Sequence, residues 1–429
     1  MSKIWIFNHY AMAPPYGTML RHYDFARYLM NAGHDVTIFA ASVTHNTEHN
    51  YIKNNSLFLE QLVDGRRFVF VRTSPYSDNS LLRVRNMLEF YLNLKKVVRR
   101  YPPPDIIYAS SPQLLVLYAG IQVARRLGVP CVSEVRDLWP ESIVEYNDIS
   151  RNNPIIQALY IMEKYIYRRS DAIIFTTEGM YDYIRNKGWD DRVDESKCHY
   201  INNGVDLEVF SRELRAFPLQ DADLNREDTF KVVYCGSIRR ANNIDLLVDC
   251  AAELQKRPDT AHIQFLIYGD GSYREVLEQR VRELKLDNIC FKGFVEKRHI
   301  PYVLSRSDLN VLNYRASDTQ RYGSSANKLF EYLAAGHPVL ANIDEGKYPI
   351  ISKYGCGEVL VDRSVSAYAD AVERFARMDA DSYEEYCRNA LQAAKLFDIR
   401  YLARHIEKVL IGCISKKKNG SKHEKRGKN

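Results

Sequence analysis

The sequence has no long hydrophobic run and no pattern of paired cysteines. No stretch approaches the ~18–20 uninterrupted apolar residues that a membrane-spanning helix needs. The first residues, MSKIWIFNHY, lack the pattern of a secretion signal. The eight cysteines are scattered without a C-x-x-C pair, which is typical of reduced, mostly buried thiols. We therefore expect a cytoplasmic protein.

The chain also lacks an excess of charge outside its C-terminal tail. Residues 416–429 carry seven basic side chains and one acid, Glu424, and the net charge of the whole chain is likewise +6. The remaining body is therefore neutral, which argues against nucleic acid as the main partner. The tail is almost free of apolar residues, so we expect it to be disordered. It serves either solubility alone or contact with an anionic membrane surface.

What the sequence does contain is enough apolar material for two domains, arranged as alternating strands and helices. Of the 429 residues, 46% are hydrophobic, which suffices for two cores. In the first half, buried strands are predicted at residues 4–7, 36–40, 68–71, 105–109, 129–135 and 172–176. Helices are predicted between them at residues 18–31, 81–100, 113–127 and 153–169. This alternation indicates parallel βαβ units in a doubly wound α/β sheet.

A polar break separates this half from a second unit of the same kind. The turn sequence NNGVD at residues 202–206 is followed by a charged stretch at 212–228 that indicates a linker. Further strands are predicted at residues 231–234, 263–268, 289–291, 309–312 and 339–341, and helices at 243–256, 275–284, 328–335, 383–396 and 399–411. We therefore predict domains over residues 1–205 and 206–395, a C-terminal helix over 396–415 and the basic tail over 416–429.

The residues GSSANKLFEYLAAGHPVLAN, 323–342, contain a loop, a helix and a buried strand in succession. Gly336 is placed to end the helix, and Pro338 prevents its continuation. The free N–H groups and the dipole at a helix N-terminus favour phosphate. We therefore assign to a nucleotide site the residues at the start of this helix: Ser324, Ser325, Asn327, Lys328 and Leu329.

Glu331 lies within the same predicted helix. A carboxylate repels phosphate, so the partner we expect for Glu331 is a neutral diol such as a ribose. The alternative is that Glu331 and Lys328 are solvated charges on the helix surface.

The segment EYLAAGHPV, residues 331–339, resembles a segment of the retaining glycosyltransferases of family 4, which have the GT-B fold. Other segments resemble the same family in the same order: residues 25–29 with 33–37, the N-G-V-D at 203–206, and the strand ends at 233–236 and 267–271. The segment RDLWPE at 136–141 is similar to a subgroup that builds surface polysaccharides such as O-antigen and capsule.

The resemblance implies two doubly wound Rossmann-like domains that face a cleft, with the C-terminal helix crossing back to the first domain. It implies a nucleotide-sugar donor, for which we expect UDP, on the second domain. It also places at the donor site the residues that follow two strands of that domain: Gly236, Ser237, Gly269 and Gly271.

Three further candidates follow from the chemistry of sugar transfer. The leaving diphosphate needs cations or preorganised donors, and Arg239 and Arg240 come just after a predicted strand, where open α/β sheets bind ligands. The family places its Arg and Lys at positions that hold Ser237 and Asn242 here, and a solvated turn is the alternative for the arginine pair. Asp137 is our choice for orienting a hydroxyl. A buried salt bridge is the alternative for its loop.

In the first domain, Gly17 and Thr18 stand where the family has a glycine-rich loop, and they are candidates for contact with the donor phosphate. One departure from the family concerns its first acid, whose position holds Gly323. We name no protein nucleophile and expect no cofactor. We also expect no metal, because His9, His22 and His34 are too separated in sequence to be claimed as ligands.

The expected function is therefore a glycosyltransferase of hexosyl or N-acetylhexosaminyl type, acting with retention on a polyprenyl-linked or oligosaccharide acceptor in surface-polysaccharide synthesis. The alternatives are a noncatalytic nucleotide-sugar-binding partner, motivated by Gly323, and an epimerase of the same architecture. The segment 81–100 is basic and rich in apolar residues. It is either a core helix with a basic outer face or, with the tail, a contact to the inner face of the cell membrane.

Overall fold

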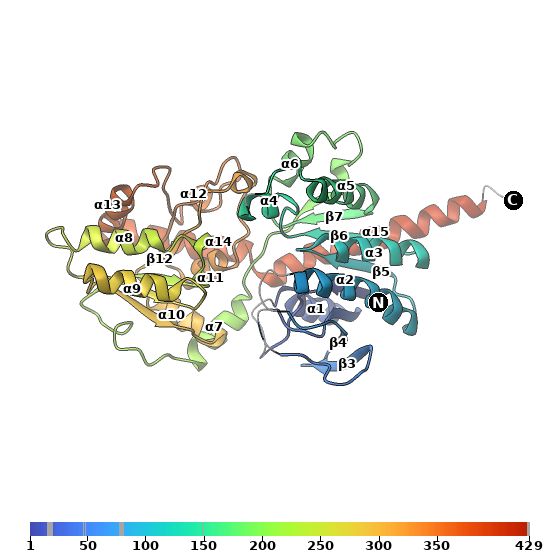
Figure 1. Ribbon diagram of the computed structural model, residues 1–429, viewed down its shortest axis with the longest axis horizontal. Helices are drawn as coiled ribbons and strands as arrows, with labels where there is room; N and C mark the ends of the chain where they lie inside the picture. Colours follow the sequence, from blue (N-terminus) through green and yellow to red (C-terminus); the bar gives the residue numbers. More distant parts are fainter. Residues whose placement is uncertain (15–19, 46, 48, 77–80, 148, 427–429) are drawn as a thin grey trace. The chain divides into compact units, whose positions relative to one another are not determined.

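The computed structural model describes residues 1–14, 20–45, 47, 49–76, 81–147 and 149–426. The chain forms two compact units, one made of residues 1–202 and 399–429 and the other of residues 203–398 (Figure 1). The units divide between Asn202 and Asn203, slightly before the predicted division at 205/206. Each unit is a sheet covered by helices, which confirms the predicted pair of doubly wound α/β domains.

The first unit is built on an eight-stranded sheet with the strand order β3-β4-β2-β1-β5-β6-β7-β8. All neighbouring strands are parallel except β3 and β4, which form an antiparallel pair. The strands are β1 Lys3–Asn8, β2 Asp35–Ala41, β3 Phe58–Val63, β4 Arg66–Val71, β5 Ile106–Ser110, β6 Cys131–Val135, β7 Ala172–Phe175 and β8 Cys198–Tyr200. The central strands are buried on both faces, as expected for parallel strands between helical layers.

Helices cover both faces of this sheet. They are α1 Arg21–Asn31, α2 Leu81–Val97 with the 3-10 turn η1 Val98–Arg100, α3 Leu114–Leu127, α4 Glu141–Asn147, α5 Pro154–Arg169, α6 Met180–Asn186, η2 Glu195–Lys197 and α15 Ile399–Arg426. Successive side chains of a strand point to opposite faces. Ile106 and Tyr108 pack in the core with α1 and α15, whereas Ile107 and Ala109 lie against Gly120 of α3.

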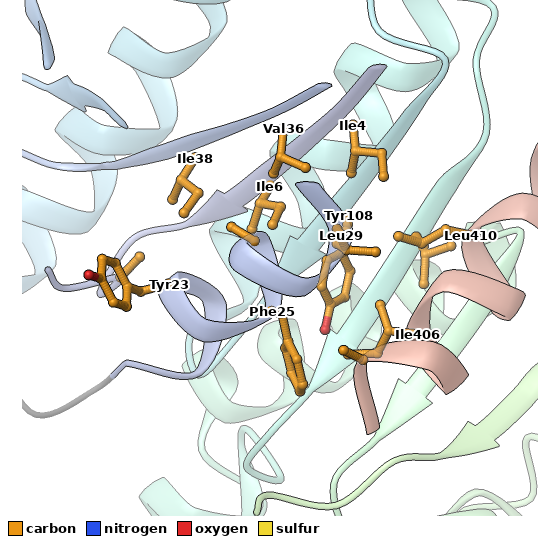
Figure 2. Packing of buried hydrophobic residues seen from close by; sticks show 14 of the residues in the cluster. Ile4, Ile6, Tyr23, Phe25, Leu29, Val36, Ile38, Tyr108, Ile406 and Leu410 are labelled. Carbon is orange, nitrogen blue, oxygen red and sulfur yellow. The ribbon is translucent and has the colours of Figure 1, made fainter. Parts of the chain in front are cut away.

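The C-terminal helix α15 belongs to the first unit and crosses back to it, as predicted. Figure 2 shows Ile406 and Leu410 of α15 beside Leu29 of α1 and Tyr108 of β5. The expectation of a disordered tail from residue 416 is wrong as far as Arg426, because the structure continues α15 to that residue. An existing helix extends at little cost through lysines, which are good helix formers.

The second unit has a six-stranded, all-parallel sheet with the order β11-β10-β9-β12-β13-β14. Its strands are β9 Phe230–Cys235, β10 Ile263–Tyr268, β11 Ile289–Gly293, β12 Leu309–Leu312, β13 Val339–Ala341 and β14 Gly357–Val359. Its helices are α7 Leu207–Ala216, η3 Arg240–Asn242, α8 Asp245–Leu254, α9 Arg274–Leu284, η4 Lys297–His299, α10 Ile300–Ser305, η5 Asp318–Tyr322, α11 Asn327–Ala335, α12 Ile351–Tyr354, α13 Val365–Ala376 and α14 Ala380–Leu396.

The expected linker at residues 212–228 is partly wrong, because its first residues belong to α7. Asp206 caps this helix, since its Oδ1 accepts a hydrogen bond from the Val209 N–H at 3.0 Å. Phe210 buries the apolar side of α7 in the core of the second unit. Among the described residues of the whole chain, no helix is long and apolar enough to cross a bilayer.

Candidate functional site

The carboxyl ends of β9 and β10 lie unusually close together, and glycines make this possible. A Cβ atom on Gly269 would lie 1.8 Å from the carbonyl oxygen of Gly236, and a Cβ atom on Gly271 would lie 2.3 Å from that of Ile238. The two loops are joined by backbone hydrogen bonds, from Gly236 N–H to Tyr268 O and from Ile238 N–H to Asp270 O, both at 2.9 Å. Gly269 and Gly271 thus shape the edge of the sheet where ligands of such folds bind.

Lys328 of α11 reaches this edge with its ammonium group. Its Nζ donates a hydrogen bond of 2.8 Å to the Tyr234 hydroxyl, and that hydroxyl donates one of 2.8 Å to the Ser237 carbonyl oxygen. A Cβ atom on Gly236 would lie 3.1 Å from the Lys328 Nζ, so the glycine leaves room beside the cation. The ring centroids of Tyr234 and Tyr314 lie 4.4 and 5.1 Å from the Nζ.

The charge of Lys328 is poorly compensated. Among the residues that the structure describes, no carboxylate pairs with its Nζ, and burial lowers the pKa of Lys328 to about 7. The nearby Cys235 raises the pKa of Lys328, but by less than burial lowers it. An ammonium held by a hydroxyl and two aromatic rings favours an anionic ligand. The alternative interpretation of Lys328 as a solvated helix charge is therefore wrong.

Glu331 lies one helical turn after Lys328 on α11 and forms an ion pair with Lys297 of η4. The side chain of Glu331 is 18% exposed and that of Lys297 is 40% exposed, so the pair is open to solvent on the lysine side. Sequence reasoning missed Lys297. The position of Lys297 in the loop after β11, at the same edge of the sheet, could have identified it as a site residue.

The loop before α11 is held by the N-G-V-D segment. The Asn203 side chain donates a hydrogen bond of 2.6 Å to the carbonyl oxygen of Ser325, and the Ser324 hydroxyl accepts one of 3.4 Å from the Ala326 N–H. Asn327 opens the helix and is exposed, whereas Leu329 is fully buried in the core. The side chain of Leu329 is therefore structural, and only its backbone can face a ligand.

Arg239 and Arg240 are exposed on the loop after β9. The guanidinium of Arg240 lies 5.1 Å from the ring centroid of Tyr273. Ser237 in the same loop is exposed, and its hydroxyl donates a hydrogen bond of 3.2 Å to the Asn242 side chain. The two arginines therefore lie near the glycine edge, and their contact with a diphosphate stays a prediction.

In the first unit, the segment 136–141 separates into two parts. Glu141 pairs with Arg151 at 3.1 Å and with Lys187, and it accepts a hydrogen bond of 2.8 Å from the Tyr160 hydroxyl. Glu141 is therefore a structural ion-pair partner. Asp137 is exposed on the loop after β6, where a ligand can reach it. Gly17 and Thr18 lie outside the described residues.

Sequence reasoning also missed Glu134, which lies at the end of β6 and is fully buried. Its carboxylate accepts hydrogen bonds from Arg21 at 2.8 and 3.0 Å, from Ser110 at 2.6 Å and from Tyr108 at 2.5 Å, and a ring nitrogen of His22 lies 2.9 Å away. Burial by itself raises the pKa of Glu134, but the Arg21 guanidinium and His22 hold it well below its usual range. Arg21 also donates to the carbonyl oxygens of Ile201 and Asn202, so this cluster ties the last segment of the unit to the sheet.

No metal-binding cluster of three or more His, Cys, Asp or Glu side chains occurs in the part of the chain that the structure describes. His22 is engaged by Glu134, His9 by Asn86 at 2.7 Å and His34 by Glu407 at 3.0 Å. These histidines thus have structural partners in separate places.

Comparisons with known proteins match both units. The description Glycosyltransferase Family 4 matches residues 21–209, and Glycosyl transferases group 1 matches residues 218–395. The chain is 25% identical over 311 residues to the putative teichuronic acid biosynthesis glycosyltransferase TuaH of Bacillus subtilis, covering 70% of each chain.

Two solved structures share the fold. The sucrose-phosphate synthase of Thermosynechococcus elongatus superposes with a TM-score of 0.75 at 18% identity, covering 97% of this chain and 100% of that one. The HepE protein of Anabaena, in complex with UDP and glucose, superposes with a TM-score of 0.68 at 16% identity, covering 96% and 99%. With both units matched by family descriptions and the two-domain fold shared, the chain belongs to glycosyltransferase family 4 and is a glycosyltransferase of the GT-B fold.

Proposed function

We propose that this enzyme transfers a sugar from a UDP-sugar, with retention, to a polyprenyl-linked or oligosaccharide acceptor in the synthesis of a surface polysaccharide. The relative TuaH is named for teichuronic acid biosynthesis, and HepE binds UDP and glucose in its crystal structure. Both names agree with a nucleotide-sugar donor and a saccharide product. The competing hypotheses of a noncatalytic partner and an epimerase lose support from the family membership.

The observation that carries the donor proposal is the position of Lys328 at the glycine edge of the second unit. Transfer of the sugar leaves a diphosphate whose developing charge must be stabilised. Lys328 offers an ammonium held in place by Tyr234, with Gly236 leaving space beside it. Arg239 and Arg240, on the loop after β9, are the proposed additional cations. We propose that Lys328, Arg239 and Arg240 together bind the leaving diphosphate.

Glu331 is the proposed ribose ligand, and Lys297 then changes partner. In the unliganded protein Lys297 neutralises Glu331. When a nucleoside diphosphate binds, the ribose hydroxyls donate to the Glu331 carboxylate. Lys297 is then free to turn towards the phosphates, which attract it more strongly than a shared carboxylate does. The backbone of the loop from Gly323 to Ser325 is proposed to contact the donor sugar, since Gly323 has no carboxylate to do so.

Asp137 is the proposed group for orienting the acceptor hydroxyl. It lies exposed after β6, whereas its neighbour Glu141 is occupied by Arg151 and Lys187. Gly17 and Thr18 are proposed to contact the donor phosphate through their backbone. We assign no nucleophile, and retention is proposed from the family alone.

The experiment is a transfer assay with a panel of UDP-sugars and a polyprenyl-diphosphate-linked acceptor, with product detection by mass spectrometry. One UDP-sugar should give a product, and its anomeric configuration by NMR should match that of the donor. Lys328→Met should abolish transfer, whereas Lys256→Met, an exposed lysine of the same unit, should not. An inverted product contradicts retention. Hydrolysis or epimerisation without transfer contradicts the proposed reaction.

We further propose that the enzyme works at the inner face of the cell membrane, where a polyprenyl-linked acceptor is held. The basic residues of segment 81–100 and of the tail motivate this location.

A further inference from the structure

Three helices of the first unit, α2, α3 and α5, lie side by side over one face of its sheet (Figure 1). Tyr118 of α3 joins them, because its ring stacks on Tyr91 of α2 with centroids 6.0 Å apart and meets Tyr165 of α5 edge-on at 5.7 Å. The opposite face of the sheet carries α1 and α15. The outer surface of these three helices, called the α2–α3–α5 face below, is thus one continuous layer.

The α2–α3–α5 face exposes large apolar side chains. On α2 they follow one outward stripe through Leu81, Leu88 and Leu92, while Met87, Phe90 and Leu94 fill the core. The exposed residues of α2 and α5 are between 44% and 87% accessible: Leu81, Leu82, Val84, Leu88, Leu92, Ile155 and Ile161. Helix α2 is thus a core helix with a basic outer face, as one of the two alternatives predicted, and its outward side is apolar as well.

The same face is strongly basic and has almost no accessible acid. Its exposed basic residues on α2, η1, α3 and α5 are Arg85, Lys96, Arg99, Arg100, Arg125, Arg126, Arg168 and Arg169. These elements contain two acids. Glu89 accepts hydrogen bonds from Arg85 and Ser74, and Glu163 is buried between the Tyr167 and Tyr183 hydroxyls.

The chemistry of Glu163 adds to this imbalance. Burial raises the pKa of the Glu163 carboxyl to about 8, so it carries little negative charge at neutral pH.

Helix α9 of the second unit shows the charge pattern of an ordinary solvated helix surface. There, Glu275, Glu278 and Glu283 are interspersed with three arginines, and Arg274 pairs with Glu278 along the helix. The α2–α3–α5 face differs from such a solvated surface in both its charge and its leucines.

We propose that the α2–α3–α5 face binds an anionic lipid bilayer, with its leucine and isoleucine side chains below the headgroups and its arginines and lysines at the lipid phosphates. A basic helix with exposed apolar residues has this preference. A nucleic acid would use the cations alone, and the exposed leucines would then remain in water. The proposal does not depend on the donor site, which lies in the second unit.

The test is co-sedimentation of the full chain with phosphatidylcholine vesicles that contain or lack phosphatidylglycerol. Binding should require phosphatidylglycerol and should weaken as salt shortens the Debye length from ~10 Å at ~0.1 M to ~3 Å at ~1 M. Each basic residue near such a surface contributes roughly a fivefold change in affinity. The charge-reversal variant Lys96→Glu/Arg126→Glu/Arg168→Glu, with one exposed residue per helix, should therefore bind at least ~100-fold more weakly.

The apolar variant Leu88→Gln/Leu92→Gln/Ile161→Gln should also lose binding. All six residues are exposed, so the variants should keep the melting temperature and the UDP affinity of the parent protein. Matched controls in the second unit, Val276→Gln/Leu284→Gln/Val361→Gln and Lys256→Glu/Lys347→Glu/Lys353→Glu, should bind vesicles normally.

Equal or negligible sedimentation with both vesicle types overturns the proposal. So does a loss confined to a chain that ends at Ser415, which would assign binding to the tail. If the apolar variant binds vesicles normally, insertion is refuted. If charge reversal abolishes a gel shift with RNA while vesicle binding is absent, the face is a nucleic-acid surface instead.

Discussion

The affinity for a UDP-sugar should fall as pH rises above about 7, because Lys328 must be protonated to pair with the diphosphate. Burial lowers the pKa of Lys328 to about 7, so above that pH most unliganded molecules hold this side chain neutral. An anionic ligand favours the charged form and raises the pKa again. Binding therefore takes up a proton, and proton uptake makes affinity fall with rising pH.

The expected magnitude follows from this pKa. With the free side chain titrating at about 7, the dissociation constant should rise roughly 30-fold between about pH 6 and about pH 8.5. This change approaches one logarithmic unit per pH unit at the upper end. At about pH 7 half of the unliganded molecules are neutral at this position, so ~0.5 proton should be taken up per ligand bound.

The assay is isothermal titration calorimetry with UDP-glucose in pairs of buffers that differ in ionisation enthalpy, which gives the number of protons directly. Both phosphates of UDP-glucose are esterified, so the ligand lacks the phosphomonoester step near pH ~6. Lys328→Met should bind weakly at every pH and take up no proton. Lys328→Arg, whose charge does not titrate, should bind with a flat pH profile. Lys256→Met serves as the matched control.

A pH-independent affinity in the parent protein would refute this account of Lys328. A pH profile that survives Lys328→Met would assign the titration to another group.

Three further predictions concern Glu331, the arginine pair and Glu134. Glu331→Ala should weaken UDP binding by ~1.5–3 kcal/mol, the range for hydrogen bonds to a charged group. Lys297→Met removes the ion-pair partner of Glu331 and should weaken UDP binding less. Unchanged UDP affinity of Glu331→Ala by calorimetry would exclude Glu331 as the ribose ligand. Arg239→Ala/Arg240→Ala should lower turnover without a change in melting temperature, since both are exposed, and normal turnover with lower stability would identify a surface turn. Glu134→Gln removes the carboxylate that neutralises the buried Arg21 cation and should reduce the free energy of unfolding by ~3–5 kcal/mol, measured by urea unfolding. Because the pKa of Glu134 is held low in the folded protein, its contribution is present above the unfolded-state pKa of ~4.3 and is lost on further acidification. A parent and a variant with equal stability near neutral pH would contradict this.

The strand pattern of both units could be predicted because it depends on local sequence. Buried parallel strands are short, continuous apolar runs between turn residues, and residues 263–268, 309–312 and 339–341 were identified with the bounds that the structure has. The strand β3 was missed because it lies at the edge of its sheet, and most of its side chains are exposed. The short strands β8 and β14 gave no comparable signal.

The helix α7 and the end of α15 show a second limit. Residues 212–228 were interpreted as a linker because of their charge, although Asp206 is a good N-cap residue for a helix that extends into them. What makes α7 a helix is the burial of Phe210 in the core of the second unit. Likewise, the basic residues from Lys416 to Arg426 are helical because α15 already runs into them from a packed segment.

The sequence by itself determined the elements that form the proposed nucleotide site, since the ends of β9 and β10 and the start of α11 follow from the order of apolar runs and glycines. Tertiary structure alone decided which side chains meet. Lys328 lies beside Tyr234, Glu331 beside Lys297, and Glu134 beside Arg21, each pair separated by many residues in the chain. It also decided that the leucines of α2 face outwards on a helix that packs beside α3. The physical reason is that periodicity reports which face of an element is apolar, whereas the partner of a side chain depends on how separate elements pack.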